Sequence, residues 1–85
     1  MSQLLMQKED YYQNLDRSID RDLKIAYLNK DWDLVAFFLE KKVSLFQNVL
    51  DIGLFDKDPL LKEQTKNTMT RCKELIIIAR QFATQ

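Results

Sequence analysis

The sequence predicts an all-α protein, a small antiparallel three-helix bundle made of a helical hairpin and a third helix. Its 85 residues include one glycine and one proline, too few for a fold rich in turns. Apolar residues recur every three or four positions along three segments, which is the spacing of one helix face. Apolar residues make up 46% and charged residues 31% of the chain. This composition is typical of a folded domain, and we expect residues 1–85 to form one.

The first helix is expected over residues 4–28. Asp20 precedes Lys24 by four residues on its charged side, the favourable order for an ion pair on a helix. Residues 29–31 form a connection short enough to make the next helix antiparallel. The apolar residues that we expect to face inward are Leu5, Tyr12, Leu15, Ile19, Leu23 and Ala26.

The second helix is expected over residues 32–51. Asp31 is placed to accept hydrogen bonds from backbone N–H groups of the first turn. Gly53 can take the left-handed conformation that ends a helix. Trp32, the single tryptophan, is expected to anchor the core rather than to bind a ligand. It begins the apolar stripe Trp32, Val35, Leu39, Val43, Phe46 and Leu50.

The third helix is expected over residues 59–83, because Asp58 favours the cap position and Pro59 the first helical position. Residues 75–79 are apolar on every side, whereas a three-helix bundle buries one stripe. The surplus isoleucines either pack against both other helices or contact a partner or a second copy. The expected inward residues are Leu61, Thr65, Thr68, Cys72, Leu75, Ala79 and Phe82.

The residues needed for the common kinds of catalysis are missing. The chain has no histidine, one cysteine and one glycine, which leaves no common general base, no zinc-type ligand set and no phosphate loop. We therefore expect no enzyme activity, no catalytic or metal-binding residues and no cofactor. Two of the acidic pairs, at 31/33 and 56/58, coincide with expected helix caps.

Charge and hydropathy also limit the partners and the cellular location that we expect. The formal net charge is zero, from 13 basic and 13 acidic residues, so no nucleic-acid partner is expected. The longest apolar run is too short for membrane insertion. A lone Cys72 and the lack of a secretory signal indicate a reducing, cytoplasmic setting.

Two segments carry a resemblance to a known family. Residues 31–34 read Asp-Trp-Asp-Leu and lead into FFLEKKVSLFQNVL, with the rhythm Leu39-Glu40-Lys41-Lys42-Val43-Ser44-Leu45-Phe46. A short acidic loop then precedes DPLLKEQTKNTMTRCKELIIIARQF. Over residues 10–83 this order of helices and spacings resembles the FliT-type flagellar export chaperones.

The resemblance implies a cytoplasmic bacterial chaperone that serves flagellum assembly and type III secretion. Such chaperones hold an export substrate, typically the filament-cap protein, through a hydrophobic surface. The chain is shorter than the better-known members and has no room for a full fourth helix, which removes the basis for any regulatory role of that helix.

The physical expectation is an apolar groove that accepts an amphipathic helix of a protein partner. The groove-lining candidates lie outside or beside the expected inward stripes. They are Phe38, Phe55, Ile76, Ile77 and Phe82. Alternatives are a small inhibitor or immunity-type regulator, and a structural coiled-coil subunit that donates its third helix to another chain. A homodimer is possible under each interpretation.

Overall fold

Three helices account for most of the chain. The computed structural model describes the backbone of residues 2–85 and the side chains of residues 9–85. Helix α1 spans Ser2–Leu28, α2 Trp32–Asp51 and α3 Pro59–Ala83, and no strand occurs in the described backbone. The all-α class is confirmed, and α1 begins two residues earlier than expected. The expected inward position of Leu5 lies outside the described side chains.

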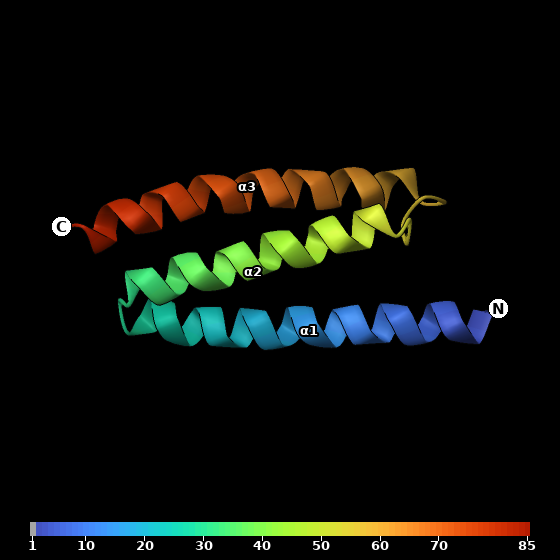
Figure 1. Cartoon of the computed structure of the whole chain (residues 1–85), viewed down its shortest axis with the longest axis horizontal. Coiled ribbons are helices and arrows are strands. Elements are labelled where there is room, and N and C mark those ends of the chain that lie inside the picture. Colours follow the sequence, from blue (N-terminus) through green and yellow to red (C-terminus); the bar gives the residue numbers. More distant parts are fainter. Residues whose placement is uncertain (1) are drawn as a thin grey trace.

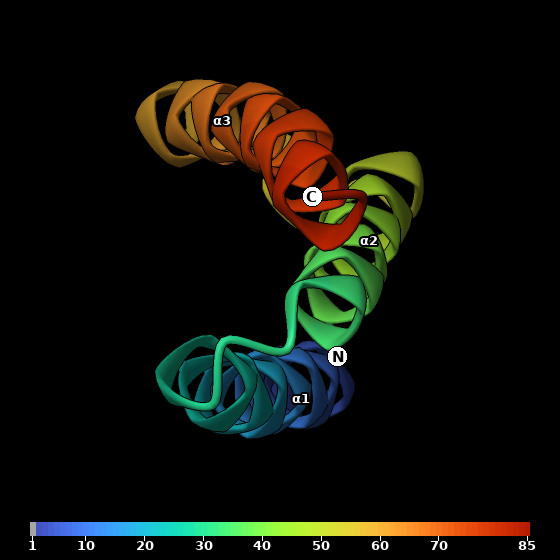
Figure 2. The same cartoon turned by 90° about the vertical axis from the view of Figure 1, so that its left-hand side faces the viewer.

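The three antiparallel helices are arranged as an arc (Figures 1 and 2). Helix α2 lies in the middle and packs against α1 on one side and α3 on the other. Within residues 2–85, no Cα atom of α1 comes within 8 Å of one in α3. The bundle is therefore open along one long side, where α1 and α3 flank α2 without meeting. The Cα trace measures 50 × 20 × 16 Å.

Both predicted N-terminal caps are confirmed. The backbone N–H of Leu34 donates to Asp31 Oδ1 at 3.3 Å, and that of Leu61 donates to Asp58 Oδ1 at 3.1 Å. Pro59 occupies the first turn of α3, where its missing N–H leaves no helical bond unmade. These caps fix where α2 and α3 begin.

Two residues in the left-handed conformation close α1 and α2. Gly53 has φ +74°, as predicted, and Leu54 N donates to Val49 O across it at 3.2 Å. Lys30 has φ +56°, and Asp31 N donates to Ala26 O across it at 3.0 Å. Both arrangements satisfy carbonyl groups at a helix end. The sequence did not predict the left-handed conformation of Lys30, because residues other than glycine rarely adopt it.

The core lies mainly between α2 and α3. On α3 the buried residues are Thr65, Met69, Cys72, Ile76 and Ala79. This row differs from the expected one, since Thr68 is exposed and Met69 is buried instead. The physical reason is that α3 packs on α2 alone, so only a narrow strip of its surface is covered. The neighbouring row, which includes Leu61, Thr68 and Phe82, stays exposed.

The apolar run at residues 75–79 is buried on one side only. Ile76 is 9% exposed and belongs to the core, whereas Ile77 and Ile78 are 60% and 42% exposed. Packing against both other helices would have covered all three, but α1 does not reach α3. Two large isoleucines therefore remain on the surface.

Helix α2 is buried more widely than a single stripe because it has a neighbour on each side. Its buried residues are Val35, Ala36, Leu39, Leu45 and Val49. Three members of the expected stripe, Val43, Phe46 and Leu50, are half-buried.

Across the described helices, none combines the length and the hydropathy needed to cross a membrane.

Candidate functional site

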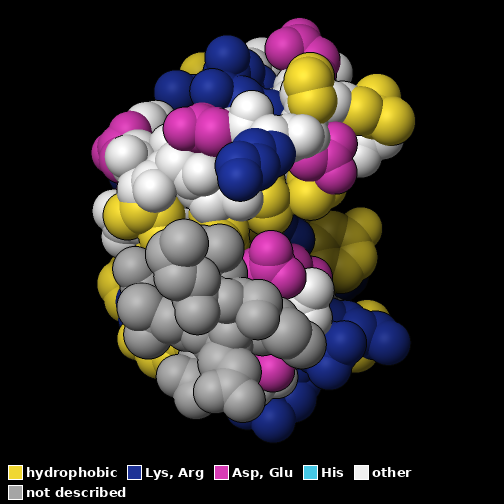
Figure 3. Space-filling view, turned by 90° about the vertical axis from the view of Figure 1, so that its right-hand side faces the viewer, with side chains coloured by type: hydrophobic (Ala, Val, Ile, Leu, Met, Phe, Trp, Pro, Cys, Tyr) yellow, Lys and Arg dark blue, Asp and Glu magenta, His cyan; other side chains and the backbone are white. Residues whose placement is uncertain are grey.

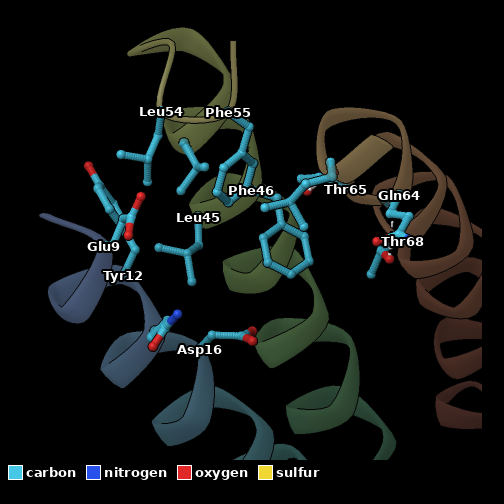
Figure 4. A pocket seen from close by; sticks show the side chains of 13 residues that line it. Glu9, Tyr12, Asp16, Leu45, Phe46, Leu54, Phe55, Gln64, Thr65 and Thr68 are labelled. Atoms are coloured by element: carbon cyan, nitrogen blue, oxygen red, sulfur yellow. Dashed lines mark hydrogen bonds between the residues drawn. The ribbon is translucent and has the colours of Figure 1, made fainter. Parts of the chain in front are cut away.

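The concave side of the arc contains two hollows, with α2 at the floor and α1 and α3 as the walls. The first, which we call the loop-end pocket, has a cavity volume of about 390 Å³ and lies beside the α2–α3 loop. Figure 4 shows side chains from α1, α2 and the loop pointing into it. Its apolar lining includes Tyr12, Leu45, Phe46, Val49, Leu54 and Phe55. From the loop end the surface is visibly hollowed between its upper and lower parts (Figure 3).

The second hollow, which we call the tryptophan pocket, lies at the opposite end of the helices and has a volume of about 520 Å³. An aromatic group lies at its end. The ring centroids of Trp32 and Phe82 are 5.1 Å apart, and those of Trp32 and Tyr27 are 5.7 Å apart with an edge-on geometry. The lining also includes Leu23, Leu75 and Ile78. Trp32 is half-buried and packs against the core, so it both anchors α2 and lines this pocket.

Helical spacing joins the two pockets into one groove, which we call the concave groove. On α1 the lining residues begin at Glu9 and continue in steps of three or four to Tyr27, so they share one face of the helix. On α3 the lining residues have the same spacing from Leu61 to Thr68 and again from Leu75 to Phe82, and no residue of α3 between these two runs lines either pocket. At 1.5 Å per residue, the α1 wall is about 27 Å long.

An ion-pair cluster lies where the two pockets meet. Lys42 of α2 has a side chain that is 15% exposed, and its Nζ lies 2.5 Å from Asp20 Oδ1 and 3.5 Å from Asp16 Oδ1. Burial alone would lower the pKa of Lys42. The hydrogen bond to Asp20 and the charges of both aspartates outweigh that effect, so the pKa is raised above its ordinary value. Lys42 is therefore charged at neutral pH.

Cys72 lies in the core near this cluster. Burial raises the pKa of its thiol above the ordinary value, and the positive charge of Lys42 only partly opposes the shift. Because the thiolate is the reactive form of cysteine, Cys72 has the character of a small core residue. Among the described side chains, no group of three or more His, Cys, Asp or Glu residues could hold a metal ion.

The structure separates the five candidate groove residues. Phe55 lines the loop-end pocket and Phe82 the tryptophan pocket. Phe38 is half-buried against the core and lies in a shallow hollow between α1 and α2 that is separate from the groove. Ile77 is exposed and lines neither groove pocket. Ile76 requires a correction: it is a core residue, because it lies in the row of α3 that packs on α2.

Several lining residues were not among the sequence candidates, notably Tyr12, Leu54 and Ile78. Tyr12 had been expected to face inward, and it does face α2, but from the open side of the arc. The expected inward row of α3 already pointed to some of the lining residues. It combined residues that pack on α2 with Leu61, Thr68 and Phe82, which line the two pockets.

No protein-family model, curated protein or solved structure matches this chain. The resemblance to FliT-type chaperones therefore stays a prediction. The description of the site depends on its geometry: an apolar groove, open to solvent along its length, with one ion-pair cluster at its centre.

Proposed function

We propose that this chain is a non-enzymatic binding protein that holds an amphipathic helix of a protein partner in the concave groove. The observation that supports this proposal is the pair of apolar pockets over α2, between two helices that do not meet. In a four-helix bundle the corresponding place is filled by the fourth helix. A helix from another protein would complete the same packing.

The dimensions of the groove fit such an occupant. Its length of about 27 Å corresponds to about five helical turns. Apolar side chains of a bound helix, spaced at i, i+3, i+4 and i+7, would enter the two pockets in turn. Burial of the half-exposed groove residues Ile78 and Phe82 would then favour binding, at about 25 cal/mol for each Å² of apolar surface removed from water.

The class of partner follows from the family resemblance. On that basis the chain is a cytoplasmic export chaperone, and its partner is a flagellar or secretion substrate such as the filament-cap protein. Large apolar surfaces of an unassembled substrate must be shielded from water before export, and an open apolar groove can shield them.

The alternatives receive less support. An inhibitor that acts by charge complementarity needs a surface of one dominant sign, whereas the chain carries equal numbers of acidic and basic residues. A coiled-coil subunit would donate α3 to another chain, but α3 packs against α2 of its own chain.

The single tryptophan allows a direct test. Trp32 lines the groove, so binding of the purified filament-cap protein of the source organism should change its fluorescence and saturate at one partner per chain. Ile78→Glu should weaken binding at least tenfold, because it places a charge on an apolar wall. Ile77→Glu is the matched control, since Ile77 is also exposed but lines neither pocket, and its affinity should be unchanged.

The outcomes test the binding site and the identity of the substrate separately. Equal affinities of the Ile78→Glu and Ile77→Glu variants would exclude the concave groove as the site. A groove that binds amphipathic helices but not the filament-cap protein would exclude that substrate and leave the binding function in place.

A further inference from the structure

The charges around the concave groove are distributed unevenly. Glu9 and Asp16 on α1 line the loop-end pocket, and no lysine or arginine lines it within the described part of the chain. The tryptophan pocket is balanced, with Asp20 and Lys24 in its lining. One half of the groove therefore has an acidic wall, and the other half has no dominant sign.

Lys42 neutralises that wall only in part. Its ammonium group hydrogen-bonds to Asp20 at 2.5 Å and forms an ion pair with Asp16 at 3.5 Å. One positive charge is thus shared by two carboxylates, which leaves an excess of one negative charge. Asp16 Oδ1 is buried and accepts no hydrogen bond from the described side chains. Glu9 adds a further carboxylate two turns away on the same helix face.

The opposite wall of the loop-end pocket offers no compensating charge. Gln64, Thr65 and Thr68 of α3 line it. The hydroxyls of Thr65 and Thr68 donate to carbonyl groups one turn earlier in α3, at 2.8 and 2.9 Å. Both hydroxyl protons therefore form hydrogen bonds within α3. The asymmetry between an acidic α1 wall and an uncharged α3 wall thus extends across the whole pocket.

From this asymmetry we infer that the occupant of the groove is an amphipathic helix with basic side chains along the edge that meets α1 at the loop-end pocket. This inference rests on the proposed function and specifies its partner. Two lysines or arginines seven residues apart would face Glu9 and Asp16, and large apolar side chains would fill the tryptophan pocket. Complementary charge raises the association rate and fixes the register of the bound helix.

The test uses two synthetic helical peptides of about five turns that differ at two positions. Both carry the same apolar anchors. One has lysines, and the other glutamates, at two edge positions seven residues apart. We measure their affinities for the full chain through Trp32 fluorescence and calorimetry at low salt. The lysine peptide should bind about tenfold more tightly, because attraction at two partly exposed sites is replaced by repulsion.

Variants of the chain locate the effect. Glu9→Gln combined with Asp16→Asn should reduce the preference for the lysine peptide to about twofold, since both carboxylates are removed. The matched control is Asp10→Asn, which removes a charge from an exposed residue of α1 that lines neither pocket. It should keep the preference near tenfold. Circular dichroism checks that each variant retains its helices.

Each outcome decides between the two proposals. Equal binding of both peptides would overturn the inference and leave the helix-binding function in place. Binding of neither peptide would overturn the proposed function and the inference with it. A tenfold preference that survives in the Glu9→Gln/Asp16→Asn variant would show that the acidic wall is not its cause. A stable dimer by light scattering that excludes the peptides would identify a second copy as the occupant instead and overturn the inference.

Discussion

The interface of α2 with α3 and that of α2 with α1 differ in how deeply they bury side chains. Helix α3 buries five residues, mainly against α2. Among the described side chains of α1, only Ala26 is buried, and it lies near the turn into α2. The rest of α1 rests on α2 through half-buried side chains and through the ion pairs of Lys42.

Because of this difference, the two halves of the arc contribute differently to stability and to the groove. The hairpin of α2 and α3 carries most of the packing, and packing is the main source of stability in a small domain. Helix α1 forms one wall of the concave groove at a shallower interface.

The largest effect should follow from a cavity in the deep interface. Ile76→Ala removes a buried side chain between α2 and α3 and should lower the free energy of unfolding by about 2–4 kcal/mol. Urea denaturation followed by circular dichroism measures the loss. Ile77→Ala is the matched control, because the neighbouring side chain is 60% exposed, and it should change stability by about 0.5 kcal/mol or less. Similar losses in both variants would contradict the placement of the core.

The comparison also predicts a difference in local opening. Amide hydrogens in the middle of α1 should exchange at least about tenfold faster than those of α2 and α3 beside the buried residues, because few apolar contacts hold α1 closed. Hydrogen exchange measured by NMR at neutral pH resolves the three helices. Uniform protection along the chain would show that α1 opens only with the whole domain. A bound helical peptide should slow exchange in α1 most, since it adds the missing contacts.

The sequence was sufficient for the elements of this fold because local chemistry decides them. Asp31 and Asp58 each accept a backbone hydrogen bond at a predicted helix start, and Gly53 adopts the predicted left-handed conformation. Each of these features depends on one residue and its immediate neighbours. The three-or-four spacing of apolar residues likewise needs no knowledge of distant parts of the chain.

The arrangement of the helices could not be obtained in the same way. Periodicity shows that a face is apolar but not which neighbour covers it, so Ile76 and Ile78 looked equivalent in the sequence. The structure buries Ile76 on α2 and leaves Ile78 in the groove. The groove exists because α1 and α3 do not meet, which is a property of packing over long sequence distances. Only Phe55 and Phe82 of the five candidates line it.

A smaller effect, of opposite sign, is expected at the turn between α1 and α2. Lys30 has φ +56°, a conformation that costs a residue with a side chain about 1–2 kcal/mol. Lys30→Gly should relieve that cost and, after the greater freedom of glycine in the unfolded chain, raise the free energy of unfolding by roughly 0.5–1 kcal/mol. Lys30→Ala is the control, since it removes the charge and keeps the strain. A glycine variant no more stable than the alanine variant would contradict the strained turn.

The smallest effect concerns the ion-pair cluster that fastens α1 to α2. The raised pKa of Lys42 means that the folded chain holds this proton more tightly than the unfolded chain does. The resulting stabilisation is fully present below the ordinary lysine pKa of about 10.4 and is lost as the pH rises through the higher folded value. The free energy of unfolding should therefore fall above about pH 10. Asp20→Asn removes the negative charge from the group to which Lys42 donates at 2.5 Å and should make this loss smaller, whereas Asp10→Asn should leave it unchanged. Identical profiles from pH 8 to 12 for the wild type and Asp20→Asn would show that the charge of Asp20 does not stabilise the protonated form of Lys42.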